Sequence, residues 1–89
     1  MKPISIGSDD YGEIGLAADY KSAVKYLIDK HYICENDTIL DDDNDGEEIT
    51  IRSKLGANWK DRMINEWDIE TFSRFMYGFY LEEAIIIEY

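Results

Sequence analysis

The stretch ISIGSDDYGEIGL, residues 4–16, has the pattern of a β-hairpin. Ile4 and Ile6 alternate with small or polar residues before a turn-rich segment. Ile14 and Leu16 alternate in the same way after it. A period of two indicates strands with one buried face, and a cluster of Gly, Ser and Asp favours a turn. We therefore predict an antiparallel hairpin that begins the sheet of the protein.

A helix is expected directly after this hairpin. Asp19 is of a residue type that caps helix N-termini, because its carboxylate can accept a backbone N–H of the first turn. The apolar side chains that then recur at helical spacing are Tyr20, Val24, Leu27 and Ile28. We predict one long helix from this cap to about Tyr32, with its apolar stripe covering one face of the sheet.

The segment 35–48 carries eight acidic residues and no Lys or Arg. The eight are Glu35, Asp37, Asp41, Asp42, Asp43, Asp45, Glu47 and Glu48. Residues 38–40 and 49–51 are β-prone, and the Asp-Gly pair at 45–46 supplies turn chemistry between them. We predict a second hairpin with an acidic tip, in the same sheet as the first.

Two shorter helices and a strand are predicted in the C-terminal part. The first helix starts at Asn58 and carries Trp59, Met63 and Trp67 on one face. The second is capped by Asp68 and carries Phe72, Phe75, Met76 and Phe79 at helical spacing. Residues 81–89 alternate as in a strand.

The predicted fold class is α+β, in a single acidic domain that covers residues 1–89. A chain of 89 residues has room for one small hydrophobic core and not for two. The expected architecture is a small antiparallel sheet, built from both hairpins and the C-terminal strand. This sheet is packed by one long helix and two shorter C-terminal helices.

The charge balance restricts the partners. The chain has 20 Asp and Glu against 9 Lys and Arg, a formal net charge of -11. Such a field repels nucleic acids and anionic membranes and attracts basic proteins. Cys34 is the only cysteine, so no intrachain disulfide can form, and no apolar run suits a signal peptide or a membrane span. We expect a cytoplasmic protein that binds neither nucleic acid nor membrane directly.

Calcium binding is one alternative for the acidic segment. In a calcium loop of the EF-hand type, Asp41, Asp43 and Asp45 would supply the first, third and fifth ligands, followed by a glycine. Glu48 then stands where an apolar residue is expected, and Arg52 stands where the loop needs a bidentate acid. The three aspartates are kept as a weak alternative calcium site, and no other metal or cofactor is expected.

Enzymatic signals are weak. His31 and Cys34 are three residues apart and could form a nucleophilic pair, but a helix-end histidine and a buried thiol account for them more simply. No phosphate-binding loop, zinc-protease motif or nucleophile elbow occurs in the sequence. We predict that the protein is not an enzyme.

A row of carboxylates can imitate the phosphates of a nucleic acid. An extended strand advances about 3.3 Å per residue, and a DNA strand carries one charge per about 3.4 Å. Aromatic anchors would add affinity, and Tyr11, Tyr26 and Tyr32 are the least committed to the core. The predicted partner-binding residues are Asp41, Asp42, Asp43, Asp45, Glu47, Glu48, Glu35, Asp37, Asp9, Asp10 and Tyr11. A solvated acidic turn without a partner is the simpler alternative.

In its short length, its acidity, its single α+β domain and its lack of a catalytic motif, the chain resembles phage-borne anti-CRISPR and anti-restriction proteins, several of which are DNA mimics. The likeness is one of overall character across the whole chain and assigns no residue a role. It implies an inhibitor of a basic nucleic-acid-binding protein in the host cytoplasm, a CRISPR effector or a nuclease. Nuclease-toxin immunity proteins share this character and are the alternative.

Overall fold

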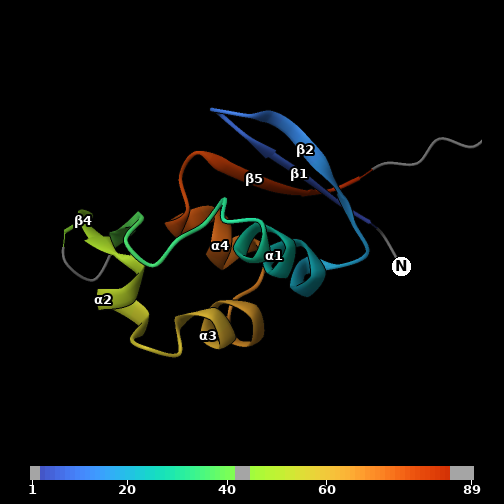
Figure 1. Cartoon of the computed structure of the whole chain (residues 1–89). Helices are drawn as coiled ribbons and strands as arrows, with labels where there is room; N and C mark the ends of the chain where they lie inside the picture. Colours follow the sequence, from blue (N-terminus) through green and yellow to red (C-terminus); the bar gives the residue numbers. More distant parts are fainter. Residues whose placement is uncertain (1–2, 42–44, 85–89) are drawn as a thin grey trace, which may run out of the picture.

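The protein is a mixed α+β domain in the computed structural model (Figure 1), which describes residues 3–41 and 45–84. A three-stranded antiparallel sheet has the order β2-β1-β5. Its strands are β1 (Ile4–Ser8), β2 (Gly12–Ala17) and β5 (Phe79–Glu83). The helices lie on one side of this sheet, and none of the described helices covers its other face (Figure 1).

The N-terminal hairpin is confirmed. β1 and β2 pair antiparallel, with Ile4 opposite Ala17, and a register shift follows Ile6. At the turn, the backbone N–H of Tyr11 donates to Ser8 Oγ at 2.9 Å. Gly12 has a φ of 70°, which a glycine adopts without steric cost. The hairpin therefore closes with the residue types that the sequence pattern indicated.

The core lies between the sheet and the helices. It collects residues from β1, β5 and α1 (Tyr20–Asp29), together with α3 (Trp59–Glu66) and α4 (Ile69–Phe75). The fully buried side chains of largest volume are Phe72, Ile6, Leu27, Ile33, Ile39, Ile51, Met63 and Val24. The hydroxyl of Tyr20 donates to the carbonyl oxygen of Met63 at 2.8 Å and so joins α1 to α3. Burial of this phenol raises its pKa.

The first helix is shorter than predicted. The cap at Asp19 is confirmed, but α1 ends at Asp29, and His31 has a left-handed φ of 62°. His is among the residue types that adopt this conformation more often than most. The reversal at His31 lets the N–H of Tyr32 donate to the carbonyl oxygen of Leu27 at 2.9 Å. It also turns the chain so that Ile33 enters the core, with 1% of its surface exposed.

The acidic hairpin forms, but not in the main sheet. β3 (Thr38–Asp41) and β4 (Glu47–Thr50) pair antiparallel as a separate two-stranded sheet. β2 and β5 pair with both edges of β1, and neither β2 nor β5 pairs with β3 or β4. The strand expected at 49–51 also stops early. Thr50 instead caps α2 (Ile51–Leu55), a helix that the sequence pattern did not indicate, by accepting the N–H of Ser53 at 3.1 Å.

The architecture of one long helix and two C-terminal helices therefore does not match well. Asp68 caps α4 as predicted, with the Thr71 N–H at 2.8 Å from its carboxylate. Asn58 precedes α3 but makes no side-chain capping bond. Phe79, predicted on the second helix, begins β5 instead, because the chain turns at Gly78 with a φ of 91°. Of the strand predicted at 81–89, residues 81–83 lie in β5, and residues 85–89 lie outside the described part.

Leu→Ala substitutions at two positions test the placement of the core. Leu27 is fully buried on α1, whereas Leu16 has 65% of its surface exposed on β2. Leu27→Ala should lower the free energy of unfolding by about 2–5 kcal/mol, because it leaves a cavity. Leu16→Ala should change it by no more than about 0.5 kcal/mol. Urea denaturation of both variants checks this, and equal effects would contradict the described packing.

Low pH should weaken the helix-capping hydrogen bonds of Asp19 and Asp68. Backbone N–H groups of Ser22 and Thr71 donate to Asp19 and Asp68, and these bonds lower the pKa of each carboxyl below its usual 3.8. A lowered folded-state pKa stabilises the protein above pH 3.8, and this contribution is lost as pH falls through the folded-state value. The Asp19→Ala/Asp68→Ala variant should melt below the wild type at neutral pH. The gap in Tm should narrow toward about pH 2, and a constant gap would contradict the assignment.

Candidate partner-binding surface

A pocket lies where four segments of the chain meet, and three predicted binding residues line it. Asp10 and Tyr11 come from the β1–β2 turn, and Asp37 comes from the segment before β3. The volume is about 370 Å³. The remaining lining residues are Tyr32, Thr38, Met76, Tyr77 and Phe79. We call this site the tyrosine pocket.

The three tyrosines of the pocket are held by defined contacts. The rings of Tyr11 and Tyr32 meet edge to face, with centroids 5.0 Å apart. Tyr26 stacks on Tyr32 from outside the pocket at 6.3 Å. The hydroxyl of Tyr77 donates to Glu48 Oε1 at 2.7 Å and lies 3.3 Å from the hydroxyl of Thr38. Ring contacts and hydrogen bonds therefore fix the walls, although Tyr11 and Tyr77 keep 64% and 49% of their surface exposed.

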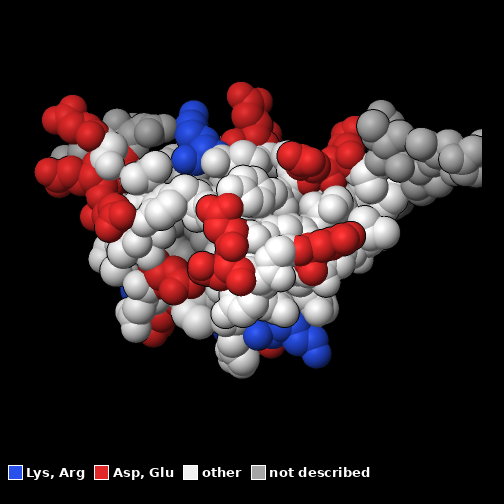
Figure 2. Space-filling view, turned by 90° about the horizontal axis from the view of Figure 1, so that it is seen from above, with Lys and Arg blue, Asp and Glu red and all other residues white. Residues whose placement is uncertain are grey.

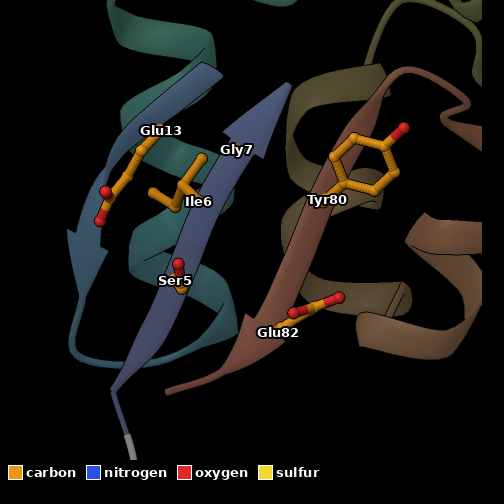
Figure 3. A pocket seen from close by; sticks show the side chains of 6 residues that line it. All are labelled: Ser5, Ile6, Gly7, Glu13, Tyr80 and Glu82. Carbon is orange, nitrogen blue, oxygen red and sulfur yellow. The ribbon is translucent and has the colours of Figure 1, made fainter. Parts of the chain in front are cut away.

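A second depression, of about 420 Å³, lies on the uncovered face of the main sheet (Figure 3). Ser5 and Gly7 on the central strand β1 form its floor, because their side chains are small. Glu13 of β2 lies on one side, and Tyr80 and Glu82 of β5 lie on the other. Small residues on the middle strand thus leave a trough between acidic edge strands.

Tyr80 also connects the trough to the hairpin turn. Its hydroxyl donates to Asp9 Oδ1, and this bond raises the pKa of the phenol. The backbone N–H of Asp9 donates to the carbonyl oxygen of Gly78 at 2.9 Å. The turn of the first hairpin is therefore fastened to the start of β5, and the Asp9 carboxylate is held by Tyr80.

Acidic side chains spread over this side of the molecule (Figure 2). The view looks onto the sheet from the side opposite the helices, and red Asp and Glu side chains extend across it. Blue Lys and Arg side chains are visible only toward the margins of the view. The face is therefore dominated by negative charge.

Asp41 and Glu35, both predicted as partner-binding acids, form ion pairs within the chain. Lys54 Nζ donates to Asp41 Oδ1 at 2.9 Å, and only 10% of the Asp41 side chain is exposed. Arg52 Nη1 donates to Glu35 Oε2 at 3.0 Å. Asp41 thus fastens β3 to α2, and it contributes to packing instead of to the exposed acidic surface. The charge pattern along the sequence gave no sign of this contact, because the partner lies 13 residues away.

The tip of the β3–β4 hairpin is only partly described. Asp45 is exposed and has a positive φ of 57°, a conformation that Asp tolerates in turns. Glu47 is exposed at the start of β4. The predicted contacts at Asp42 and Asp43 lie outside the described residues.

The calcium alternative gains no support. Within residues 3–41 and 45–84, no group of three acidic, His or Cys side chains is arranged to hold a metal ion. One of the three proposed ligands, Asp41, already binds Lys54, and Asp43 lies outside the described residues. A calcium loop would have to break the Asp41–Lys54 ion pair.

Cys34 is exposed and not buried as expected, because the chain leaves the core after Ile33. Its Sγ donates to the backbone carbonyl oxygen of His31 at 3.6 Å. That contact uses the backbone of His31 and not its imidazole, so it activates no nucleophile.

Two residues of this surface were missed by sequence reasoning. Tyr77 and Tyr80 each place a hydroxyl on an acidic side chain, Glu48 and Asp9 respectively. The only local signal was that both are polar-tipped aromatics next to a glycine turn at position 78. Their partners lie 29 and 71 residues away in sequence, so the contacts depend on the tertiary fold.

Comparison of the chain with protein-family models, with curated proteins and with solved structures finds no match. Within the described part of the chain, no helix is long and apolar enough to cross a membrane.

Charge-neutralising substitutions distinguish the packed acid, Asp41, from an exposed one, Asp45. Asp41→Asn should lower the free energy of unfolding by about 1–3 kcal/mol, because it weakens the partner of a partly buried Lys54 ammonium. Asp45→Asn, the matched control, should leave stability unchanged or raise it, since Asn also tolerates a positive φ and one repelling charge is removed. Thermal denaturation of both variants checks this. A destabilisation confined to Asp45→Asn would contradict the described pairing.

Proposed function

We propose that the protein is a small acidic inhibitor. It binds a nucleic-acid-processing protein and occupies the DNA- or RNA-binding surface of that partner as a phosphate mimic. The class of partner that the resemblance implies is a CRISPR effector or nuclease of a host defence system. The proposed mode of action is stoichiometric binding, with no chemical step.

One observation carries the proposal: two tyrosine hydroxyls each hold a carboxylate, and we call these four residues together with Asp10 the acidic edge. Glu48 binds Tyr77, which lines the same pocket as Asp10. The neighbouring residue, Asp9, binds Tyr80. Glu48 of β4 is thus held by a residue of the pocket that Asp10 of the first hairpin turn also lines, although the two acids lie far apart in the sequence.

This edge meets the physical needs of a phosphate mimic. Fixed carboxylates lose little freedom when a partner binds, and a concentrated negative field speeds the encounter with a basic groove. Aromatic side chains next to the charges supply contact area that charge alone does not. Tyr11 and Tyr77, both largely exposed, are in the right place for this.

The simpler alternative of a solvated acidic turn explains fewer features. A charged turn that only keeps a protein in solution requires no exposed aromatic rings and no fixed carboxylates. Tyr77 combines both, because its ring lines the pocket and its hydroxyl holds Glu48. The arrangement therefore favours a binding surface.

Two variants with equal net charge test the proposal. The first removes acids of the edge and the tip by Asp10→Asn, Asp45→Asn and Glu48→Gln. The control removes exposed acids of α1, α3 and α4 by Asp29→Asn, Asp61→Asn and Glu70→Gln. Each immobilised variant is compared with the wild type in the capture of nucleic-acid enzymes from bacterial lysate.

The first variant should bind about ten-fold more weakly than the wild type, because each exposed charge pair contributes about 0.2–1 kcal/mol. The control should retain nearly all of the captured enzyme. Equal losses in both variants would show that only net charge matters, and unchanged capture by the first variant would refute the proposed surface.

A further inference from the structure

The tyrosine pocket has the size and lining of a receptor for one side chain. Its volume of about 370 Å³ is near the lower end of the range for ligand sites. Three tyrosines, Met76 and Phe79 are among its lining residues, and most of the lining surface is polar. Thr38 and the two aspartates, Asp10 and Asp37, supply the polar part of the lining.

The lining attracts cations by two separate effects. The faces of tyrosine rings carry partial negative charge and hold a cation within about 6 Å of the ring centre. The carboxylates of Asp10 and Asp37 add full negative charge, and no Lys or Arg is among the lining residues. Asp37 is held in place, since its Oδ2 accepts the backbone N–H of Cys34 at 2.8 Å.

In the described part of the chain, the cation–π contacts lie on rings outside the tyrosine pocket. Among the described residues, Lys54 and Arg74 lie over the ring of Phe75, and Lys60 lies over Trp59. None of these contacts involves a ring of the tyrosine pocket. The rings that are covered by a cation therefore belong to the helical side, and the pocket rings face no cation of the described chain.

We infer that the tyrosine pocket binds an arginine side chain of the partner protein, an inference that rests on the proposed function for the identity of the partner. A planar guanidinium can stack on Tyr11 or Tyr77 and donate to the carboxylate of Asp10. Arginines that bind phosphate or a base edge are frequent in nucleic-acid-binding grooves. An arginine held in the tyrosine pocket could no longer bind the phosphate or base of its nucleic acid.

A titration of the isolated protein tests the pocket without any partner. N-acetyl-arginine methylamide is added to isotope-labelled protein, and the ring resonances of Tyr11, Tyr32 and Tyr77 are followed by NMR. N-acetyl-citrulline methylamide is the control ligand, because it has nearly the same shape and no charge. Arginine amide should give saturable shifts at these rings, and citrulline amide should give much smaller ones.

A matched pair of variants controls for folding. Tyr77 lines the pocket and is 49% exposed, whereas Leu16 on β2 is 65% exposed and is not a lining residue. Tyr77→Leu should weaken arginine binding about two- to five-fold, which corresponds to the loss of one cation–π contact. Leu16→Ala should leave the affinity unchanged.

The inference is overturned if citrulline amide shifts the rings as strongly as arginine amide, if no saturable shift occurs, or if the two variants behave alike. These results are independent of the capture experiment. If arginine amide binds but no nucleic-acid enzyme is captured, the arginine-binding pocket is supported and the proposed inhibitor function is refuted. If a nucleic-acid enzyme is captured but arginine amide does not bind, the inhibitor function is supported and the arginine-binding pocket is refuted.

Discussion

The pairing of β1 on both edges is the constraint on which the rest of the structure depends. Because β2 and β5 occupy both edges, the two ends of the described chain meet at one strand. The inner face of β1 buries Ile4 and Ile6 against the helices. Its outer face carries Ser5 and Gly7, which leaves the trough open. One strand therefore fixes the core and shapes the acidic face at the same time.

The acidic hairpin lies outside this pairing. It forms a small sheet of its own and is held by other contacts. Asp41 binds Lys54 of α2, and Glu48 binds Tyr77 after α4. Part of the negative charge thus stabilises the fold, and Glu48 is held at the surface. Repulsion among the surface acids destabilises the folded state, and a basic partner would relieve it.

Local signals in the sequence predicted much of the fold. The first hairpin and the caps at Asp19 and Asp68 follow from alternation and from side-chain chemistry within a few residues. The end of α1 depends on the burial of Ile33, and the position of the second sheet depends on contacts with distant segments, such as Asp41–Lys54 and Glu48–Tyr77. Both are properties of the whole fold, so short-range patterns did not reveal them.

The sequence predicted the negative charge of the candidate surface but not the arrangement of its residues. Asp10, Tyr11 and Asp37 were predicted as binding residues from acidity and exposure alone, and the fold brings them into one pocket. Tyr77 completes that pocket through contacts between distant segments, which no local pattern encodes. Asp41 was assigned to the binding surface for its charge, yet it lies buried against Lys54.

The most direct measurement is a competition between the protein and DNA for a captured partner. A nucleic-acid enzyme retained by the immobilised protein is eluted with increasing duplex DNA, and the salt dependence of binding is recorded. A phosphate mimic predicts that DNA displaces the enzyme completely and that affinity falls steeply with salt. An enzyme that binds DNA and the protein together, with little effect of salt, would contradict the account.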